Sequence, residues 1–246
     1  MTHASKPSLF SKFNAISSMD YHILIINILL VTTFIACDIE TGTTVEPQKV
    51  YQAYALAYSL AKNETEARAL FQEGSSFGTI LTDISCTVNG RSFTEFASFN
   101  YFPYGIHFTG LVRSAKFSFI DSKGQEHLNF LSIDSVSPIL IPETFESFKM
   151  GRDTIMTWVG TPLVSDEEAI LTLSTSTNLW EFSTSLRGDS TIPILRTSQL
   201  TLVPGVTEAS LKRIRHLPLD DATTAGGKKY ISIVSMNKSI TILPSN

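Results

Sequence analysis

The amino-acid sequence predicts a mainly β protein, with one N-terminal helix followed by antiparallel β-structure and a β-sandwich. Ser and Thr are abundant and charged residues make up only 17% of the chain, a composition that favours strands over helices. From residue 79 onward the apolar residues tend to alternate with polar ones, which is the period of a strand with one buried face. Gly, Pro and Asn separate these short segments, as in all-β domains.

The composition is that of a folded protein without a nucleic-acid partner. With 246 residues, 43% of them hydrophobic, the chain is long enough for one large domain or two small ones. Its net charge of −4 argues against nucleic acid, because nucleic-acid binders carry a concentrated basic face. The densest basic stretch is Lys212, Arg213, Arg215 and His216. Alternation along a strand divides such side chains between two faces, so we expect a solvated strand edge there.

An apolar segment at residues 23–36 predicts export of the protein. Its clearly polar interruptions are Asn27, Thr32 and Thr33, and basic residues precede it. A run of about 14 residues matches the hydrophobic region of a signal peptide and is shorter than the ~20 residues of a membrane-spanning helix. We therefore expect residues 1–36 to be a signal peptide.

The residues Phe34-Ile35-Ala36-Cys37 end this segment, and here the chain resembles bacterial lipoproteins. In that family the signal peptide is cut directly before a cysteine, whose thiol receives a diacylglycerol. The resemblance implies that Cys37 carries fatty acids such as palmitate, that the membrane is a partner through this lipid, and that the body lies in the cell envelope, outside the cytoplasm. The alternatives are an uncleaved anchor helix over residues 21–39 and ordinary cleavage, and Met19 is a second candidate start.

Residues 37–49 predict a tether between the lipid and the folded body. They are polar, contain Gly42 and Pro47, and show no periodicity, which is typical of a linker. If Cys37 is acylated, the only other cysteine, Cys86, has no partner within the chain, and we expect it to be a small buried hydrophobe. A disulfide between Cys37 and Cys86 is the alternative if the lipid is absent.

Residues 50–135 predict a region with one helix and several strands. Six alanines favour a helix over residues 50–73, with a break at Asn63 and an end at Gly74. Beyond it, Asn89-Gly90 and residues 121–124 are turn signals. The strands expected around these turns are residues 79–88, 91–101, 106–112, 116–120 and 127–133. We expect the aromatic residues of this region to pack in a core.

Residues 136–246 predict a β-sandwich, since Pro138 and Pro142 mark a boundary before many short strands. The expected strands are residues 154–159, 169–174, 179–184, 191–195, 200–203, 209–216, 230–236 and 239–243, with Asn237-Lys238 as a hairpin that pairs the last two. Residues 153–158, Asp-Thr-Ile-Met-Thr-Trp, are similar to an early strand of immunoglobulin-like domains on bacterial surface proteins. The resemblance implies an immunoglobulin-like fold with Trp158 in its core.

The motifs for chemistry are weak, and we expect no catalytic residue, no metal site and no cofactor. Residues 74–78 match the Gly-x-Ser-x-Gly pattern around Ser76, but this nucleophile motif needs a strand before it and a helix after it, and the sequence predicts the reverse order. His107 and His127 fall in neighbouring predicted strands without a third metal ligand. The acidic clusters at residues 166–168 and 220–221 lack the spacing of a calcium site, so we expect solvated loop charges.

These observations predict an envelope lipoprotein that acts as a binding or assembly module. The predicted contacts are Tyr101, Phe102 and Tyr104, which lie beside Pro103 and Gly105 in an expected loop, and the expected partner is a protein or a glycan. One alternative is an envelope hydrolase that uses Ser76 with His107 or His127. The other is a structural subunit of a surface assembly.

Overall fold

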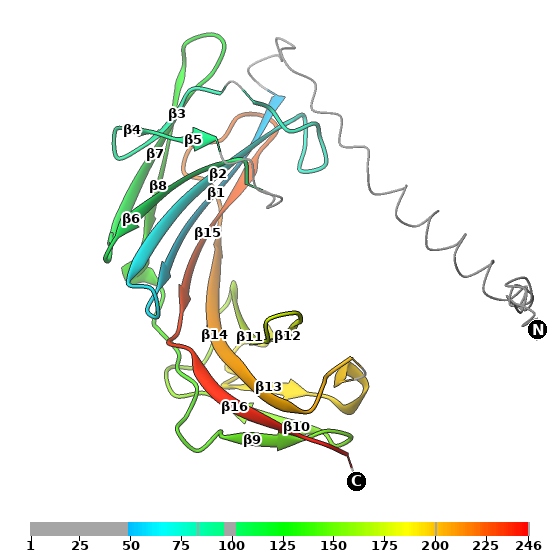
Figure 1. Ribbon diagram of the computed structural model, residues 1–246. Coiled ribbons are helices and arrows are strands. Elements are labelled where there is room, and N and C mark those ends of the chain that lie inside the picture. Colours follow the sequence, from blue (N-terminus) through cyan, green and yellow to red (C-terminus); the bar gives the residue numbers. More distant parts are fainter. Residues whose placement is uncertain (1–48, 83, 96–101, 200, 246) are drawn as a thin grey trace, which may run out of the picture. The chain divides into compact units, whose positions relative to one another are not determined.

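A computed structural model describes residues 49–246, except 83, 96–101, 200 and 246 (Figure 1). The chain divides into the units Met1–Ile39 and Glu40–Asn246, and the account below concerns the second unit. The predicted signal peptide and Cys37 lie outside the described residues, as does nearly all of the predicted tether. Within the described part, no helix has both the length and the apolar character that a membrane crossing requires.

The described chain is mainly β, as the sequence predicts, and its strands form two lobes. In the first lobe, part of a ten-stranded sheet faces a four-stranded sheet, and a hydrophobic core lies between them. The large sheet contributes β15 (Gly227–Val234), β1 (Val50–Ser59), β2 (Glu64–Glu73), β6 (Tyr104–Thr109) and β5 (Thr94–Glu95), in this order. The facing sheet has the order β4 (Arg91–Ser92), β3 (Cys86–Val88), β7 (Ser114–Ile120) and β8 (Glu126–Ser132), which leads into a 3-10 turn, η2 (Ile133–Ser135).

The helix expected over residues 50–73 is wrong, because this segment forms the antiparallel hairpin β1–β2. In β2 the residues alternate strictly between the core and the outer face, with Thr65, Ala67, Ala69 and Phe71 buried. Asn63 has φ 48° and belongs to the turn between the strands. Alanine propensity favours a helix by less than about 1 kcal/mol per residue, whereas sheet pairing on both sides buries the whole inner face of the hairpin.

Aromatic rings fill the core of the first lobe. Phe71 lies between three of them, with ring centroids 4.9 Å from Phe119, 5.8 Å from Tyr104 and 5.9 Å from Tyr54. Cys86 is buried in the same core with a free thiol, which confirms its prediction as a small buried hydrophobe. Burial strongly raises the pKa of this thiol, so it stays protonated.

The turns of this region are confirmed. Asn89 and Gly90 both have positive φ, 51° and 75°, the conformation that a two-residue hairpin turn requires. Asp121 closes the turn before β8 by accepting hydrogen bonds from the backbone amides of Lys123 and Gln125. Of the strand expected over residues 79–88, only Cys86–Val88 forms, with an isolated bridge between Ile80 and Gln72.

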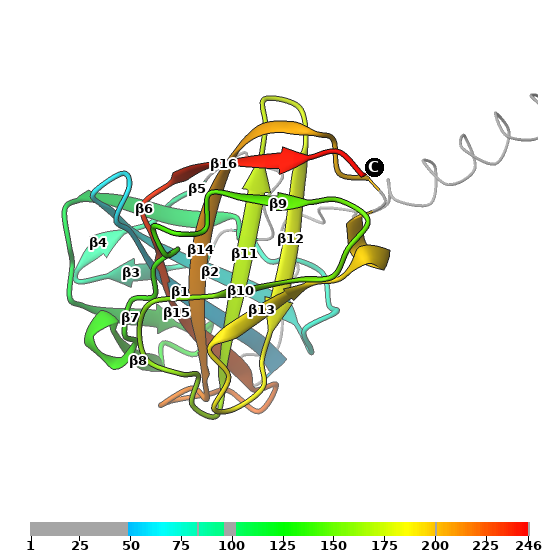
Figure 2. The same ribbon diagram turned by 90° about the horizontal axis from the view of Figure 1, so that it is seen from below.

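The second lobe packs the other part of the large sheet against a strand pair (Figure 2). The sheet contains β12 (Leu179–Thr184), β11 (Glu167–Ser174), β14 (Gly205–Leu217), β16 (Lys238–Leu243) and β9 (Ser147–Lys149), and the pair consists of β10 (Thr154–Thr157) and β13 (Thr191–Ile194). Residues 201–203, expected in a strand, instead follow a 3-10 turn, η3 (Arg196–Gln199). Trp158 is 4% exposed in this core, as predicted.

The strand pairing of the second lobe is immunoglobulin-like. Counted along the chain, its strands are β9, β10, β11, β12, β13, β14 and β16. The second and fifth pair in one sheet, and the third, sixth and seventh adjoin in the other, which is the arrangement of immunoglobulin domains. The fourth strand, β12, extends the second of these sheets, as an added strand does in variable-type domains.

The long strand β14 belongs to both lobes. Its first half pairs with β16 and its second half with β15, while β11 runs along its other edge. The hairpin expected at Asn237-Lys238 is therefore wrong: β15 and β16 follow one another along the same edge of β14 and do not pair together. Because β15 also pairs in parallel with β1, it belongs to the first lobe. Along the chain, however, it lies between β14 and β16, which are strands of the second lobe.

The basic stretch of β14 is not a solvated edge. Arg213 is 2% exposed and forms an ion pair with Glu167, whose side chain is also 2% exposed. Its guanidinium also donates to the Thr161 carbonyl and hydroxyl at 3.0 and 2.9 Å and to the Pro162 carbonyl at 2.9 Å. The prediction of solvated charges is thus wrong for Arg213 and Glu167, since β14 lies inside the sheet and turns Arg213 toward the second core.

Candidate functional site

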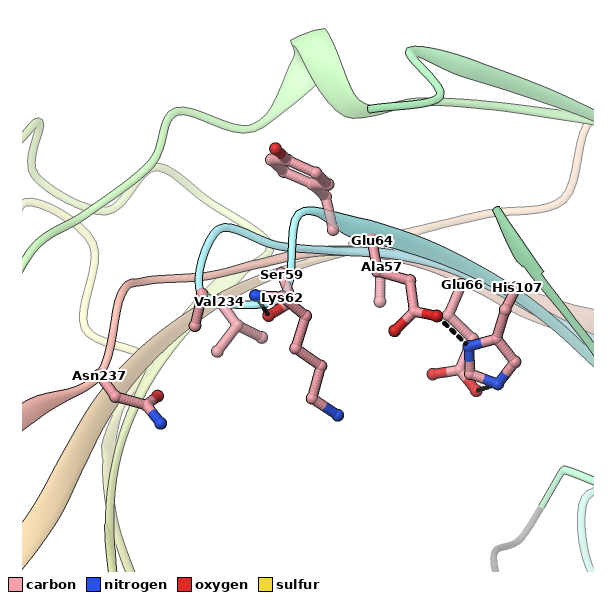
Figure 3. Close-up of a pocket in the computed structure, with 10 residues that line it drawn as sticks. Ala57, Ser59, Lys62, Glu64, Glu66, His107, Val234 and Asn237 are labelled. Atoms are coloured by element: carbon pink, nitrogen blue, oxygen red, sulfur yellow. Dashed lines mark hydrogen bonds and ion pairs between the residues drawn. The ribbon is translucent and has the colours of Figure 1, made fainter. Parts of the chain in front are cut away.

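A pocket of about 280 Å³, lined by both apolar and charged residues, lies at the turn end of the β1–β2 hairpin (Figure 3). The last residues of β1 and the turn form one wall, and β2 and β6 supply Glu64, Glu66 and His107. Val234 and Asn237 come from the end of β15 and the link to β16, so segments about 170 residues apart in sequence meet there. Figure 3 shows Lys62, Glu66, His107 and Asn237 on the same side of the strands.

Small side chains make the hollow. Ala57 pairs with Glu66 on one side and Ser232 on the other, and Ser59 pairs with Glu64 and Val234. Residues that alternate along a strand point to one face, and Ala57 and Ser59 occupy the outer face of β1, opposite the buried Leu56. Their short side chains leave space that the longer neighbours on β2 and β6 enclose.

His107 lies between the two carboxylates of the pocket. The Nδ1 atom of His107 lies 3.3 Å from a Glu64 carboxylate oxygen, and its Nε2 atom lies 3.4 Å from a Glu66 carboxylate oxygen. Glu66 also accepts a hydrogen bond of 2.6 Å from Arg68. Lys62 stands in the turn on the same rim. The lining therefore offers both hydrogen-bond donors and acceptors, among them two carboxylates and one ammonium, and Arg68 pairs with one of the carboxylates from outside the lining.

A second polar cluster joins the two sheets of the first lobe. Asp220 and Asp221, in the loop between β14 and β15, bind to β8: Asp220 accepts from the Phe130 amide at 2.7 Å, and Asp221 lies 3.1 Å from Nδ1 of His127. The side chain of Asn129 donates to the Asp221 carbonyl at 3.0 Å. These two aspartates are acceptors that fix the loop to the edge of β8, while their side chains stay 47% and 41% exposed, so they are loop charges in contact with solvent, as predicted, but with a structural role.

The same cluster perturbs two carboxyl groups. Burial by itself raises the pKa of Asp220, but hydrogen bonds from Lys229 and the Phe130 amide outweigh this and lower the pKa. For Asp121, burial again opposes the hydrogen bonds from Gln125, Lys123 and His127, and the pKa is lowered. A carboxyl group whose folded pKa is depressed stabilises the fold above its unfolded pKa, near 4, and loses that contribution as the pH falls through the folded pKa.

We expect the free energy of unfolding to fall as the pH decreases below about 4, and the Asp220→Asn variant to show a weaker fall. The carboxyl group of Asp220 lies 2.5 Å from Lys229, and this pairing is lost when the carboxyl group is protonated. The amide of the variant is neutral at every pH, so the variant has no such pairing to lose as the pH falls. Urea unfolding between pH 6 and pH 2 measures the free energy of unfolding. The control is Asp134→Asn, because Asp134 is an exposed ion-pair partner of Arg113. Equal pH profiles of Asp220→Asn and the unchanged chain would contradict it.

The structure describes two of the three predicted contact residues. Tyr101 lies outside the described residues, and Phe102 is partly buried. Tyr104 is in β6, 4% exposed, and its hydroxyl donates to the Leu81 carbonyl at 3.3 Å and accepts from the Ile84 amide at 3.2 Å. Tyr104 is thus a core residue rather than an exposed contact, because the alternation of β6 turns it inward.

The residues of the alternative chemistry are also placed apart. Ser76 is exposed in the turn after β2, so a strand precedes it instead of the expected helix, and the residues after it form only the bridge at Ile80. His107 lies in the ten-stranded sheet and His127 in the four-stranded sheet, so they are not strand neighbours. Among the residues that the structure describes, no group of His, Cys, Asp and Glu is arranged to hold a metal ion.

Sequence signals for the pocket were present but indirect. The alternating charges of Glu64, Glu66 and Arg68 indicate the exposed face of a strand, but the alanines of the same segment favour a helix. Nothing in the sequence joins Asn237 to this hairpin, because their proximity follows from the pairing of β15 with β1.

Comparison with known proteins identifies no family. No protein-family model matches the chain, and no curated protein matches it. Among solved structures, it is similar to the FN1–FN3 domains of chicken CNTN1, at 9% identity, 78% coverage of this chain and a TM-score of 0.25. It is also similar to a Ca²⁺-stabilized adhesin with which an Antarctic bacterium binds ice, at 9% identity, 83% coverage and a TM-score of 0.24.

A third similar structure concerns the host cell surface retention of a 1.5-MDa bacterial ice-binding adhesin, at 10% identity, 80% coverage and a TM-score of 0.20. The chain spans 67%, 50% and 66% of the three structures, in the order given. These scores are too low to carry an argument about function. The immunoglobulin-like character of the second lobe rests on its own strand pairing.

Proposed function

We propose that this chain is a tethered binding module of a cell envelope, and that it holds a neutral, hydroxyl-rich ligand, such as one unit of a glycan, in the pocket of the β1–β2 hairpin. The observation that carries the proposal is the convergence of two carboxylates, a histidine, a lysine and an amide around one hollow with a floor of small residues. The proposed module acts by binding and not by catalysis.

The charge balance favours a neutral ligand. Glu64 and Glu66 face His107 and Arg68, and Lys62 lies on the same rim. A polyanion would meet two carboxylates, and a polycation would meet the lysine and the arginine. Sugar hydroxyls both donate and accept hydrogen bonds, so they can accept from the Lys62 ammonium and the Asn237 amide and donate to the carboxylates.

The size of the pocket favours a small unit. Its volume of about 280 Å³ lies just below the ~300–1,000 Å³ of pockets that enclose drug-sized ligands. Because the pocket opens on the outer face of the sheet, a longer chain can continue beyond the unit that fills it. An open pocket of this size fits the binding of one unit of a polymer such as a surface glycan better than the binding of a free metabolite.

The tether fits this role. The apolar segment at residues 23–36 and Cys37 are the proposed anchor, and β1 is the first strand of the described residues. Val50 and Glu73 lie at that end of the hairpin, whereas Ser59 and Glu64 lie at the pocket end. Ten residues of strand span roughly 30 Å, so the hairpin places the pocket well away from the point where the tether joins the body.

Filling the pocket is expected to abolish glycan binding. In the Ala57→Phe variant a phenyl ring occupies the floor beside Glu66 and Ser59. Binding is measured by NMR titration of the body with neutral oligomers of hexose and of N-acetylhexosamine. We expect shifts at Lys62, His107 and Asn237 in the unchanged protein and none in the variant.

Thr172→Phe is the matched control, because Thr172 lies on the outer face of the same sheet in the second lobe, opposite Glu181 and Ser210. It adds the same ring without touching the pocket and should leave binding unchanged. Thermal unfolding shows whether each variant is folded. If the neutral oligomers shift no pocket signal while a phosphate-bearing or oligolysine probe does, the proposed ligand class is wrong.

A further inference from the structure

An isolated aromatic ring stands out from the end of the first lobe where the tether joins. Phe77 is 96% exposed, the most exposed large hydrophobic residue of the described chain. It lies in the turn Gly74-Ser75-Ser76-Phe77-Gly78, between β2 and the bridge at Ile80. Single exposed apolar residues are common on protein surfaces, so exposure alone would not point to a partner.

The turn is ordered by its own hydrogen bonds and holds the ring outward. The Phe77 amide donates to the Ser75 hydroxyl at 3.3 Å, and the Gly78 amide donates to the Ser75 carbonyl at 3.1 Å. The Gln72 side chain donates to the Gly78 carbonyl at 3.1 Å. A Cβ atom at Gly78 would lie 1.7 Å from the Glu73 carbonyl oxygen, so the tight closure of the turn requires glycine there.

This turn is hydrogen-bonded directly to the first described residue, Lys49. The Gly74 amide donates to the Lys49 carbonyl at 2.5 Å, and Val50 pairs with Glu73. Figure 1 shows the beginning of β1 beside the loop that follows β2. The tether and the exposed ring therefore leave the body at the same end of the hairpin, opposite the pocket.

The tether is short enough to bring this end to the membrane. Eleven residues, 38–48, separate Cys37 from Lys49. A flexible chain of that length has an r.m.s. end-to-end distance of about 18 Å and a maximum of about 40 Å. The net charge of −4 offers no overall attraction to an anionic bilayer, so a contact with the membrane has to be apolar.

We propose that the turn at residues 74–78 is a membrane contact, in which Phe77 inserts into the interface of the bilayer that holds the anchor. This inference depends on the anchor of the proposed function and does not depend on the ligand of the pocket. The contact adds the apolar area of one ring to the lipid anchor. It also fixes the orientation of the hairpin, so that the pocket faces away from the membrane.

Fluorescence of a Phe77→Trp variant tests the contact. The full chain, purified from membranes, is reconstituted into phosphatidylcholine vesicles with or without brominated acyl chains, and flotation measures membrane attachment separately. The two native tryptophans, Trp158 and Trp180, are buried in the second lobe and give a constant background. We expect the added emission to shift to the blue on vesicles and to be largely lost with brominated lipid.

Leu186→Trp is the matched control, because Leu186 is 72% exposed in the loop between β12 and β13 of the second lobe. Its emission should stay unshifted and unquenched. A floating Phe77→Trp chain without quenching overturns the contact and leaves the anchor intact. Equal quenching of both variants shows unspecific adsorption and also overturns it. A chain that does not float overturns the anchor, and the contact with it, while the pocket remains testable on the body.

Discussion

Replacing Glu167 by alanine is expected to destabilise the protein by about 3–5 kcal/mol, because it leaves the buried guanidinium of Arg213 without its counter-ion. Both side chains are 2% exposed, so water cannot replace the lost carboxylate. Glu167 also accepts a hydrogen bond of 2.8 Å from the Val164 amide, which the substitution removes. The pair connects β11 and β14 to the Thr161–Pro162 segment, so its loss loosens the second lobe.

Urea unfolding of Glu167→Ala beside Asp134→Ala measures this effect. Asp134 pairs with Arg113 at 2.6 Å, but their side chains are 56% and 69% exposed, and such surface pairs contribute only about 0.2–1 kcal/mol. Replacing both buried partners together, as in Glu167→Leu with Arg213→Met, is expected to recover much of the loss, since no uncompensated charge then remains. A Glu167→Ala effect as small as that of Asp134→Ala would show that water reaches Arg213.

Replacing Phe71 by alanine is expected to destabilise the first lobe by about 3–5 kcal/mol, the usual cost of removing a buried phenyl ring. Phe71 is fully buried, and its ring contacts those of Tyr54, Tyr104 and Phe119. Removing it leaves a cavity between the two sheets, and the surrounding rings can collapse into it only in part. Thermal or urea unfolding monitors the loss.

Phe77→Ala is the matched control for this substitution. It removes the same side chain from the same hairpin region, but at a position 96% exposed, where changes are usually within about 0.5 kcal/mol. A small effect at both positions would mean that the first core tolerates a cavity. A large effect at Phe77 would mean that its ring packs against the body, which would also remove the basis of the membrane contact.

Local signals in the sequence determined the β class, most strands after residue 105 and several turns. Period-two alternation and turn residues such as Asn89-Gly90 act within a few residues, so they can be recognised without the fold. The strand-like run around Cys86 also determined the burial of this residue, whereas the burial of Trp158 was implied by the resemblance to immunoglobulin-like domains. The proposed anchor likewise depends only on residues near Cys37.

Long-range pairing decided the rest. The alanine-rich segment of β1 and β2 is a hairpin because β15, from the end of the chain, pairs in parallel with β1, and no local rule includes that partner. β15 and β16 both pair with β14, which places β14 and Arg213 inside the sheet. The same arrangement brings Asn237, between β15 and β16, next to the turn of the β1–β2 hairpin. The pocket therefore exists only in the tertiary structure, since its residues acquire a common surface through contacts between strands far apart in sequence.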